Sequence, residues 1–315
     1  MINRTTHKSP SEFVSKRTPF RFFGIEKLVA VSPLTYLPYL TLMILVLNSF
    51  EAVYSDGPVL LLAFLGLANS VWLRDARYWM AMASLYGLGV FSNWATCDNH
   101  QFLILYWCVL LASVQASPIN ERESVLASNS RLLIALCMGL AVFWRISSDN
   151  YLDGTFFELT LLSDPRFEGF SNWFASAPIG QLAENRELLA LLKDGHQFGV
   201  PMESVSLNQS SGVRSVALAV TWWTLLIESA IAIAFVLPDH RSTAVLRNTL
   251  LLVFAVTTYS VATVRGFGWI LMSLGLAQSG IRDRNFRPFY VAAFALVQIY
   301  TFPMLEVIQA LGLAR

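Results

Sequence analysis

The chain has 315 residues, of which 55% are hydrophobic and only 14% are charged. A soluble domain is typically about 25% charged, so this composition indicates an integral membrane protein. The formal net charge is +1, from 22 Lys and Arg against 21 Asp and Glu, which gives no support to nucleic-acid binding. Three cysteines, Cys97, Cys108 and Cys137, stand at no metal-ligand spacing and predict neither a disulfide framework nor a metal site.

Residues 1–32 form a basic segment that lacks the apolar core of a cleavable signal peptide. Its Ser9-Pro10-Ser11-Glu12 stretch fits a capping box with Pro at the first helical position. We expect an amphipathic helix lying on the cytoplasmic leaflet.

Apolar runs fill most of residues 33–315, which we predict to be one transmembrane domain. They fall at 34–54, 58–73, 79–97, 102–118, 132–148, 215–237, 248–264, 266–280 and 288–312. The predicted fold is an all-α polytopic bundle of about nine spans, the second and eighth being short for a bilayer.

Positive charges set the expected orientation of this bundle. Most Lys and Arg precede the first span or lie in alternate connections, which contain Arg74 and Arg77, Arg122 and Arg131, Arg241 and Arg247, and Arg282, Arg284 and Arg287. The positive-inside rule then predicts a cytoplasmic amino terminus and, with an odd span number, an extracytoplasmic carboxyl terminus.

Residues 149–212 form the large extracytoplasmic loop of this topology. Segments 156–162 and 181–192 are typical of helices, and Gly195 is a candidate C-cap of the second. The apolar face of that second helix is expected to lie on the membrane or to cover the spans.

Glu228 lies within the apolar run 216–237, which spans roughly 33 Å as a helix. A carboxylate at that depth costs at least ~2.5 kcal/mol on insertion scales, so it should face protein or a water-filled space. Counting residues from the inner ends of the helices places no Lys or Arg at the level of Glu228. The side chains expected at that level are neutral and polar: Thr257, Thr258, Tyr259, Gln298 and Tyr300. We therefore expect Glu228 to be protonated or hydrogen-bonded rather than ion-paired, serving either a ligand or only the packing of helices.

A second polar group is expected near the outer face, and it comprises Asn93, Asp98, Asn99, His100, Arg145, Asp149, Asp153 and Arg265. Arg145 stands at i, i+4 spacing from Asp149, which favours an ion pair that snorkels to the interface, or else a clamp for an anion or headgroup. His100 is either an outward-facing acid or base or a solvated loop histidine. Glu228, His100 and Arg145 are the catalytic candidates, and the others are candidates for substrate binding.

Three stretches resemble the membrane domain of vitamin K-dependent gamma-carboxylases and the related horizontally transferred transmembrane (HTTM) family. They are RLLIALCMGLAVFWR ending at Arg145 with the turn 149–157, the segment WWTLLIE ending at Glu228, and 254–259 with 266–269. The resemblance covers about residues 80–280, and it implies a helical bundle with an internal cavity for a lipid or quinone.

Two departures bear on the chemistry that this resemblance implies. Carboxylases carry lysines before the turn, one of them the catalytic base, where this chain has Arg145 and Ile146. Arginine does not readily deprotonate in a protein and is a poor base. A histidine that relatives carry near Ala255 is also missing, so carboxylation is not the expected reaction.

The sequence thus favours an HTTM-like multipass protein of the bacterial inner membrane that binds a lipid, a quinone or an exported peptide, with catalysis unassigned. A quinone is the candidate cofactor, and membrane lipids, an exported peptide or a membrane protein are the candidate partners. Two alternatives stay open: a non-enzymatic subunit that docks a partner through the outer loop, and a small-solute transporter.

Overall fold

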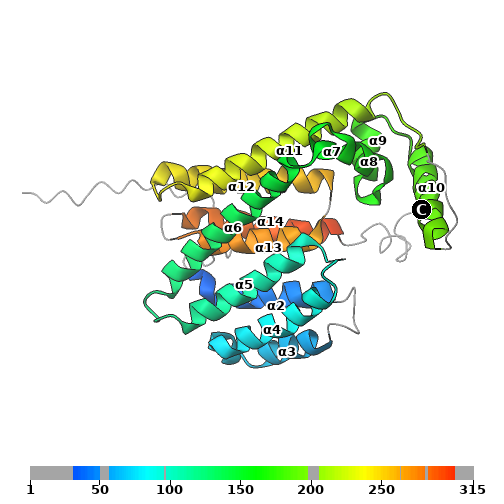
Figure 1. The fold of residues 1–315 in the computed structure, drawn as a ribbon. Coiled ribbons are helices and arrows are strands. Elements are labelled where there is room, and N and C mark those ends of the chain that lie inside the picture. The colour runs from blue at the N-terminus through cyan, green and yellow to red at the C-terminus, as the bar shows by residue number, and fades with distance from the viewer. Residues whose placement is uncertain are drawn as a thin grey trace, which may run out of the picture.

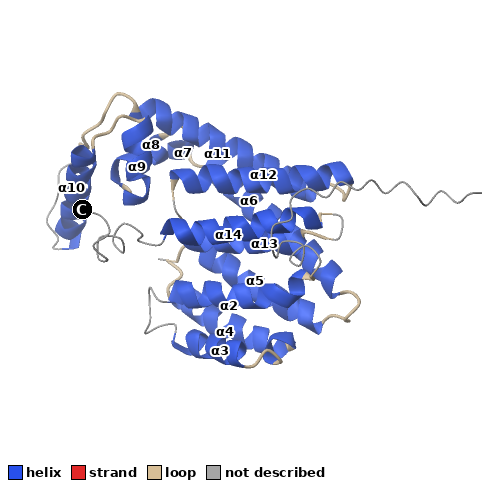
Figure 2. Ribbon diagram, turned by 180° about the vertical axis from the view of Figure 1, so that it is seen from behind, coloured by secondary structure: helices blue, strands red, loops and turns tan. Residues whose placement is uncertain are grey.

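The computed structural model describes residues 31–49, 57–95, 97–197, 206–262, 264–280 and 283–301. Within these ranges the chain forms helices and no strand, as the sequence predicts (Figures 1 and 2). The expected interfacial helix in residues 1–32 lies almost wholly outside the described residues.

The first half of the chain supplies five long helices and one short helical turn. These elements are α2 (Pro33–Ser49), α3 (Gly57–Ala68), η1 (Trp72–Arg74), α4 (Ala76–Ser92), α5 (Asn99–Ala116) and α6 (Arg122–Ile146). Helix α4 packs against α5, and α2 packs against α3. Helix α5 also packs against α6. The α4 helix begins where the Asp75 side chain accepts a hydrogen bond from the backbone of Arg77.

The expected outer loop folds into short helices and one longer helix at one end of the bundle (Figure 1). They are α7 (Asp149–Leu152), α8 (Thr155–Ser163), η2 (Pro165–Phe167), α9 (Glu168–Phe174) and α10 (Ile179–Gln197). Both predicted helices are confirmed as α8 and α10. The C-cap expected at Gly195 is wrong, because α10 continues through that residue to Gln197.

Four helices complete the fold: α11 (Val213–Val236), α12 (Arg241–Val261), α13 (Arg265–Gln278) and α14 (Arg287–Thr301), with η3 (Arg284–Phe286) before the last. Within the described ranges, each of the nine apolar segments predicted from the sequence overlaps one α-helix. By length and composition, two of the described helices, α6 and α11, are able to cross a membrane, while α2, α3 and α13 contain shorter apolar stretches.

Helix α13 is the central element, packed against α14, α6, α2, α5 and α12 (Figure 2). Every residue from Gly268 to Ser279 is buried. Two glycines make room for aromatic rings: an ideal Cβ on Gly268 would stand 2.6 Å from the Tyr259 ring, and one on Gly275 would stand 2.4 Å from the Tyr290 ring. Glycine is required at both sites because the rings occupy the space of a side chain.

Helices α6 and α11 form an antiparallel pair with the most extensive contact in the bundle. Small residues face each other midway, where a Cβ on Gly139 would lie 4.0 Å from the Ala232 methyl group. The two helices are thus close enough for side chains near their ends to bridge them.

Large apolar side chains are exposed along the outward faces of several long helices. The set includes Leu61, Phe64, Leu88, Phe91, Tyr106, Leu132, Leu136, Leu140, Phe143, Trp144, Leu226, Ile233, Val253, Val256, Phe289 and Leu296. Exposed apolar surface of this extent indicates contact with a membrane or another protein. A second, smaller apolar cluster joins Tyr151, Phe157 and Leu161 of the outer region to Ala217 and Leu225 of α11.

Candidate functional site

The carboxylate of Glu228 forms an ion pair with the guanidinium of Arg145, joining Oε2 to Nη1. Glu228 lies in the middle of α11 and Arg145 in the last turn of α6. The Glu228 side chain is only 5% exposed, whereas that of Arg145 is 28% exposed. One member of the pair is therefore buried and the other reaches the molecular surface.

This ion pair corrects the expectation of a neutral Glu228 with no base at its depth. Depth counting compared Cα positions, which place Arg145 about 6 Å farther out than Glu228. Side chains on a helix lean toward its amino terminus, and α6 and α11 run in opposite directions. Arg145 therefore leans inward and Glu228 outward, so the two side chains meet.

Tyr151 supports the guanidinium from the other side. The Arg145 Cζ atom lies 5.2 Å from the centroid of the Tyr151 ring, within the range of a cation–π contact. The Tyr151 hydroxyl shares a 2.7 Å hydrogen bond with Thr224 Oγ1. Thr224 lies one turn from Glu228, so a single face of α11 positions both partners of Arg145.

Gly154 allows the turn after α6 to pack closely against α11. Its φ of +84° lies in the left-handed region, which glycine adopts without strain. A Cβ at this position would also stand 3.0 Å from Leu218 Cδ2. The contacts at Glu228, Thr224 and Leu218 thus lie progressively farther outward along α11, and the turn 149–154 closes the site.

The ion pair leaves hydrogen-bonding capacity unused. Arg145 has five N–H donors, yet beyond the ion pair with Glu228 it donates no hydrogen bond to any residue the structure describes. Both Arg145 Nη1 and Glu228 Oε2 are buried, and beyond their contact with each other neither has a hydrogen-bond partner in the described ranges. The other N–H groups of this partly exposed guanidinium are available to a ligand with acceptor atoms.

The residues expected around Glu228 have other environments. Thr257 accepts a 3.4 Å hydrogen bond from Trp223 Nε1 and donates to the Val253 carbonyl. Tyr259 packs on Gly268, and its buried hydroxyl has no hydrogen-bond partner among the described residues. Thr258 is half-buried on α12, and the side chains of Gln298 and Tyr300 on α14 lie outside the described structure.

His100 is not a solvated loop residue, which corrects that expectation. It lies in the first turn of α5 with its side chain only 13% exposed, and its Nδ1 is 3.8 Å from Asp98 Oδ2. A Cβ on Gly266 would stand 2.4 Å from His100 Nε2 and 3.0 Å from Asn48 Oδ1. The histidine therefore packs between α2 and α13, because glycine leaves space for the ring.

The remaining outer residues have mainly local contacts. Asn93 caps α4 and donates to the Gly89 carbonyl, and Asn99 is the first residue of α5. Asp153 accepts a 2.8 Å hydrogen bond from Thr155 N, which lowers the pKa of its exposed carboxyl. Asp149 is exposed, and the pair expected between it and Arg145 is replaced by the pair with Glu228. The side chain of Arg265 lies outside the described structure.

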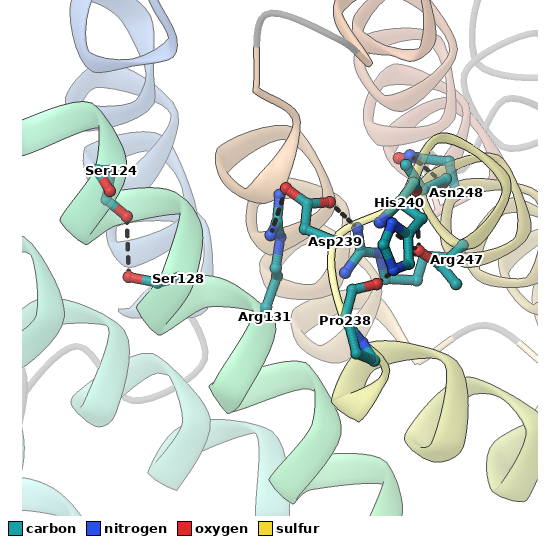
Figure 3. Close-up of polar contacts among 10 residues, drawn as sticks. Ser124, Ser128, Arg131, Pro238, Asp239, His240, Arg247 and Asn248 are labelled. Atoms are coloured by element: carbon teal, nitrogen blue, oxygen red, sulfur yellow. Dashed lines mark hydrogen bonds and ion pairs between the residues drawn. The ribbon is translucent and has the colours of Figure 1, made fainter.

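A charged cluster at the opposite end of the α6–α11 pair was missed by the sequence reasoning (Figure 3). Asp239, after α11, contacts Arg131 Nη1 at 3.1 Å and Arg247 Nη2 at 2.5 Å. Partial burial would raise the pKa of Asp239, but the two arginines outweigh it and hold the pKa below its usual value. The only sequence signal was the position of Asp239 between two helices that both carry arginine.

Beside this cluster lies a buried polar network, also missed from the sequence. The Asn248 side-chain oxygen accepts 2.7 Å hydrogen bonds from Gln278 Nε2 and from the Tyr290 hydroxyl. It joins α12, α13 and α14, and all three side chains are fully buried. The three residues lie in separate apolar runs, and the sequence contains no pattern that predicts their contact.

The fold and site together define an all-helical protein with exposed apolar faces and a buried ion pair between its two longest apolar helices. No family model, curated protein or solved structure matches the chain. Within the described residues, no three His, Cys, Asp or Glu side chains are grouped to hold a metal ion.

Proposed function

We propose that the protein is a multipass integral membrane protein that binds the polar headgroup of a lipid or quinone at Arg145 and Glu228. Its apolar helices are the first support for a membrane location. In the most apolar 18-residue stretch of each helix, only 28% of α6 and 33% of α11 is buried within the molecule. The core helices of a soluble protein are mostly buried. Lipid would cover the remaining apolar faces.

The distribution of arginines supports an orientation with the amino terminus in the cytoplasm. The α5–α6, α11–α12 and α13–α14 connections lie at one end of the bundle, opposite α7–α9 (Figure 1). Arg122, Arg241 and Arg284 lie at this end, as expected for cytoplasmic connections. About nine spans, a bacterial inner membrane and an extracytoplasmic carboxyl terminus belong to the same proposal.

The observation that carries the binding site is the unused donor capacity of Arg145. Its guanidinium is held by Glu228 and Tyr151, is partly exposed, and donates no other hydrogen bond to the described residues. Phosphate, carboxylate and carbonyl oxygens are the acceptors that match a planar guanidinium. Exposed Trp144, the neighbour of Arg145 in α6, supplies apolar surface for the rest of an amphipathic ligand.

The likeness to HTTM proteins and gamma-carboxylases remains part of this proposal. Arg145 acts in it as a binding group rather than a base, because a guanidinium stays protonated. Glu228 orients Arg145, and both residues belong to the site whether or not a reaction occurs there.

Lipids and quinones that co-purify with the protein test this function. Wild-type protein extracted in mild detergent and analysed by mass spectrometry is expected to carry a lipid or quinone in a fixed ratio. Arg145→Gln is expected to bind it about 10- to 100-fold more weakly, since a charge-assisted hydrogen bond contributes about 1.5–3 kcal/mol. Arg145→Lys should recover part of the binding through the retained charge.

A matched control is Arg166→Gln, which removes another arginine from an ion pair with Asp164 in the outer region. It should keep the ligand. Equal ligand content in wild type and in folded Arg145→Gln, judged by a single symmetric gel-filtration peak, would refute the proposed site.

A further inference from the structure

The cytoplasmic end of the bundle brings two arginines onto one carboxylate. Arg131 from α6 and Arg247 from α12 both contact Asp239, so the cluster carries one excess positive charge (Figure 3). The amino terminus of α12 lies at the same place, with His240 as its N-cap, and adds a partial positive charge. The local field therefore favours a further negative charge.

The arginines are only partly satisfied by Asp239. Arg247 is 1% exposed, and its Nε is buried without a hydrogen-bond partner in the described part of the chain. The Nε atom of Arg131 is also buried without a hydrogen-bond partner in the described part of the chain. Leaving buried donors of charged groups unpaired is costly, and an anion with several oxygens would pair more of them than one carboxylate does.

Asp239 itself is accessible, with 47% of its side chain exposed. Thr243 fixes the loop that carries it, accepting from His240 N and donating to the Pro238 carbonyl at 2.7 Å. The carboxylate thus covers the two guanidinium groups from the solvent side, at the end expected to face the cytoplasmic leaflet. An anion that displaced it would reach both arginines.

We propose that Arg131 and Arg247 form a binding site for a phosphate group, and that Asp239 is the built-in counter-ion that the phosphate displaces. The phosphate belongs either to a headgroup of the cytoplasmic leaflet or to a free phosphate ion. This site is separate from the one at Arg145, and its test does not depend on the outer ligand.

Calorimetric titration of the detergent-purified protein tests the proposal and separates the two sources. The probes are inorganic phosphate, a short-chain phosphatidic acid below its critical micelle concentration, and the matching phosphatidylcholine, whose headgroup has no net charge because choline balances the phosphate. If inorganic phosphate binds, the site accepts free phosphate. If phosphatidic acid binds and inorganic phosphate does not, the site is specific for a lipid headgroup. Absence of binding by both, in wild type and in Asp239→Asn, overturns the proposal.

Two variants are expected to act in opposite directions. Asp239→Asn removes the competing carboxylate and should tighten phosphate binding at least about tenfold, whereas Arg131→Gln should weaken it by a similar factor. Arg241→Gln removes an exposed arginine at the start of the same helix and is the matched control, expected to change binding less than twofold. Weaker binding in Asp239→Asn, or equal losses in Arg131→Gln and Arg241→Gln, would contradict the assignment.

Discussion

Replacing Glu228 with Leu is expected to lower the free energy of unfolding by about 3 kcal/mol. The substitution leaves the guanidinium of Arg145 largely buried beside an apolar group and without its counter-ion, a change that typically costs about 3–5 kcal/mol. We expect the lower end of this range because Arg145 retains some exposure. Replacing Arg145 with Met leaves the carboxylate unpaired and should cost about as much.

The double variant Glu228→Leu/Arg145→Met is expected to be nearly as stable as the wild type. Replacing both charges by apolar side chains of similar size removes the desolvation cost together with the attraction. Chemical unfolding in mixed detergent micelles measures the free energy of unfolding of the wild type, the two single variants and the double variant. Additive losses in the double variant would show that the two side chains are not coupled, and the ion pair would then be wrong.

Replacing Gly275 with Val is expected to be at least as damaging as breaking the ion pair, with a loss of about 3 kcal/mol or failure to fold. Even the first carbon of a side chain would enter the Tyr290 ring, which is fully buried. Overpacking of this kind typically costs about 1–3 kcal/mol. Moving the ring would also break the 2.7 Å bond from the Tyr290 hydroxyl to Asn248, which adds to the loss.

Gly180→Ala is the matched control for this prediction. Gly180 lies in the first turn of α10, and no atom lies within 4 Å of the position of an added Cβ. Alanine should therefore be neutral or raise stability by up to about 1 kcal/mol through its helix propensity. If Gly275→Val and Gly180→Ala unfolded at the same temperature, the close packing of α13 against Tyr290 would be refuted.

The helices were predictable from the sequence because long apolar runs and their polar connections are local features. Each predicted apolar run contains a helix, and the expected helix at 181–192 lies within α10. The C-cap at Gly195 failed because glycine lowers helix propensity without always ending a helix. The central place of α13 was not predictable, since Gly268 and Gly275 mark close contacts only once their partners are known.

The candidate site was predictable in its residues but not in its pairing. Glu228 and Arg145 each stood out alone, and the lean of side chains on antiparallel helices brought them together. Tyr151 and Thr224 were missed because they are 73 residues apart in sequence and meet only where the turn after α6 packs against α11. Asp239 was missed because its partners Arg131 and Arg247 lie far from each other in sequence.

The central claim is that Arg145, held by Glu228, binds the headgroup of an amphipathic ligand within a membrane. An electron cryomicroscopy map of the protein in nanodiscs made with its native lipids tests this most directly. The predicted result is non-protein density within hydrogen-bonding distance of the Arg145 guanidinium, continuing as an apolar tail past Trp144, with Glu228 still paired. A well-resolved map in which Arg145 contacts only protein or water, with no such density, would contradict the account.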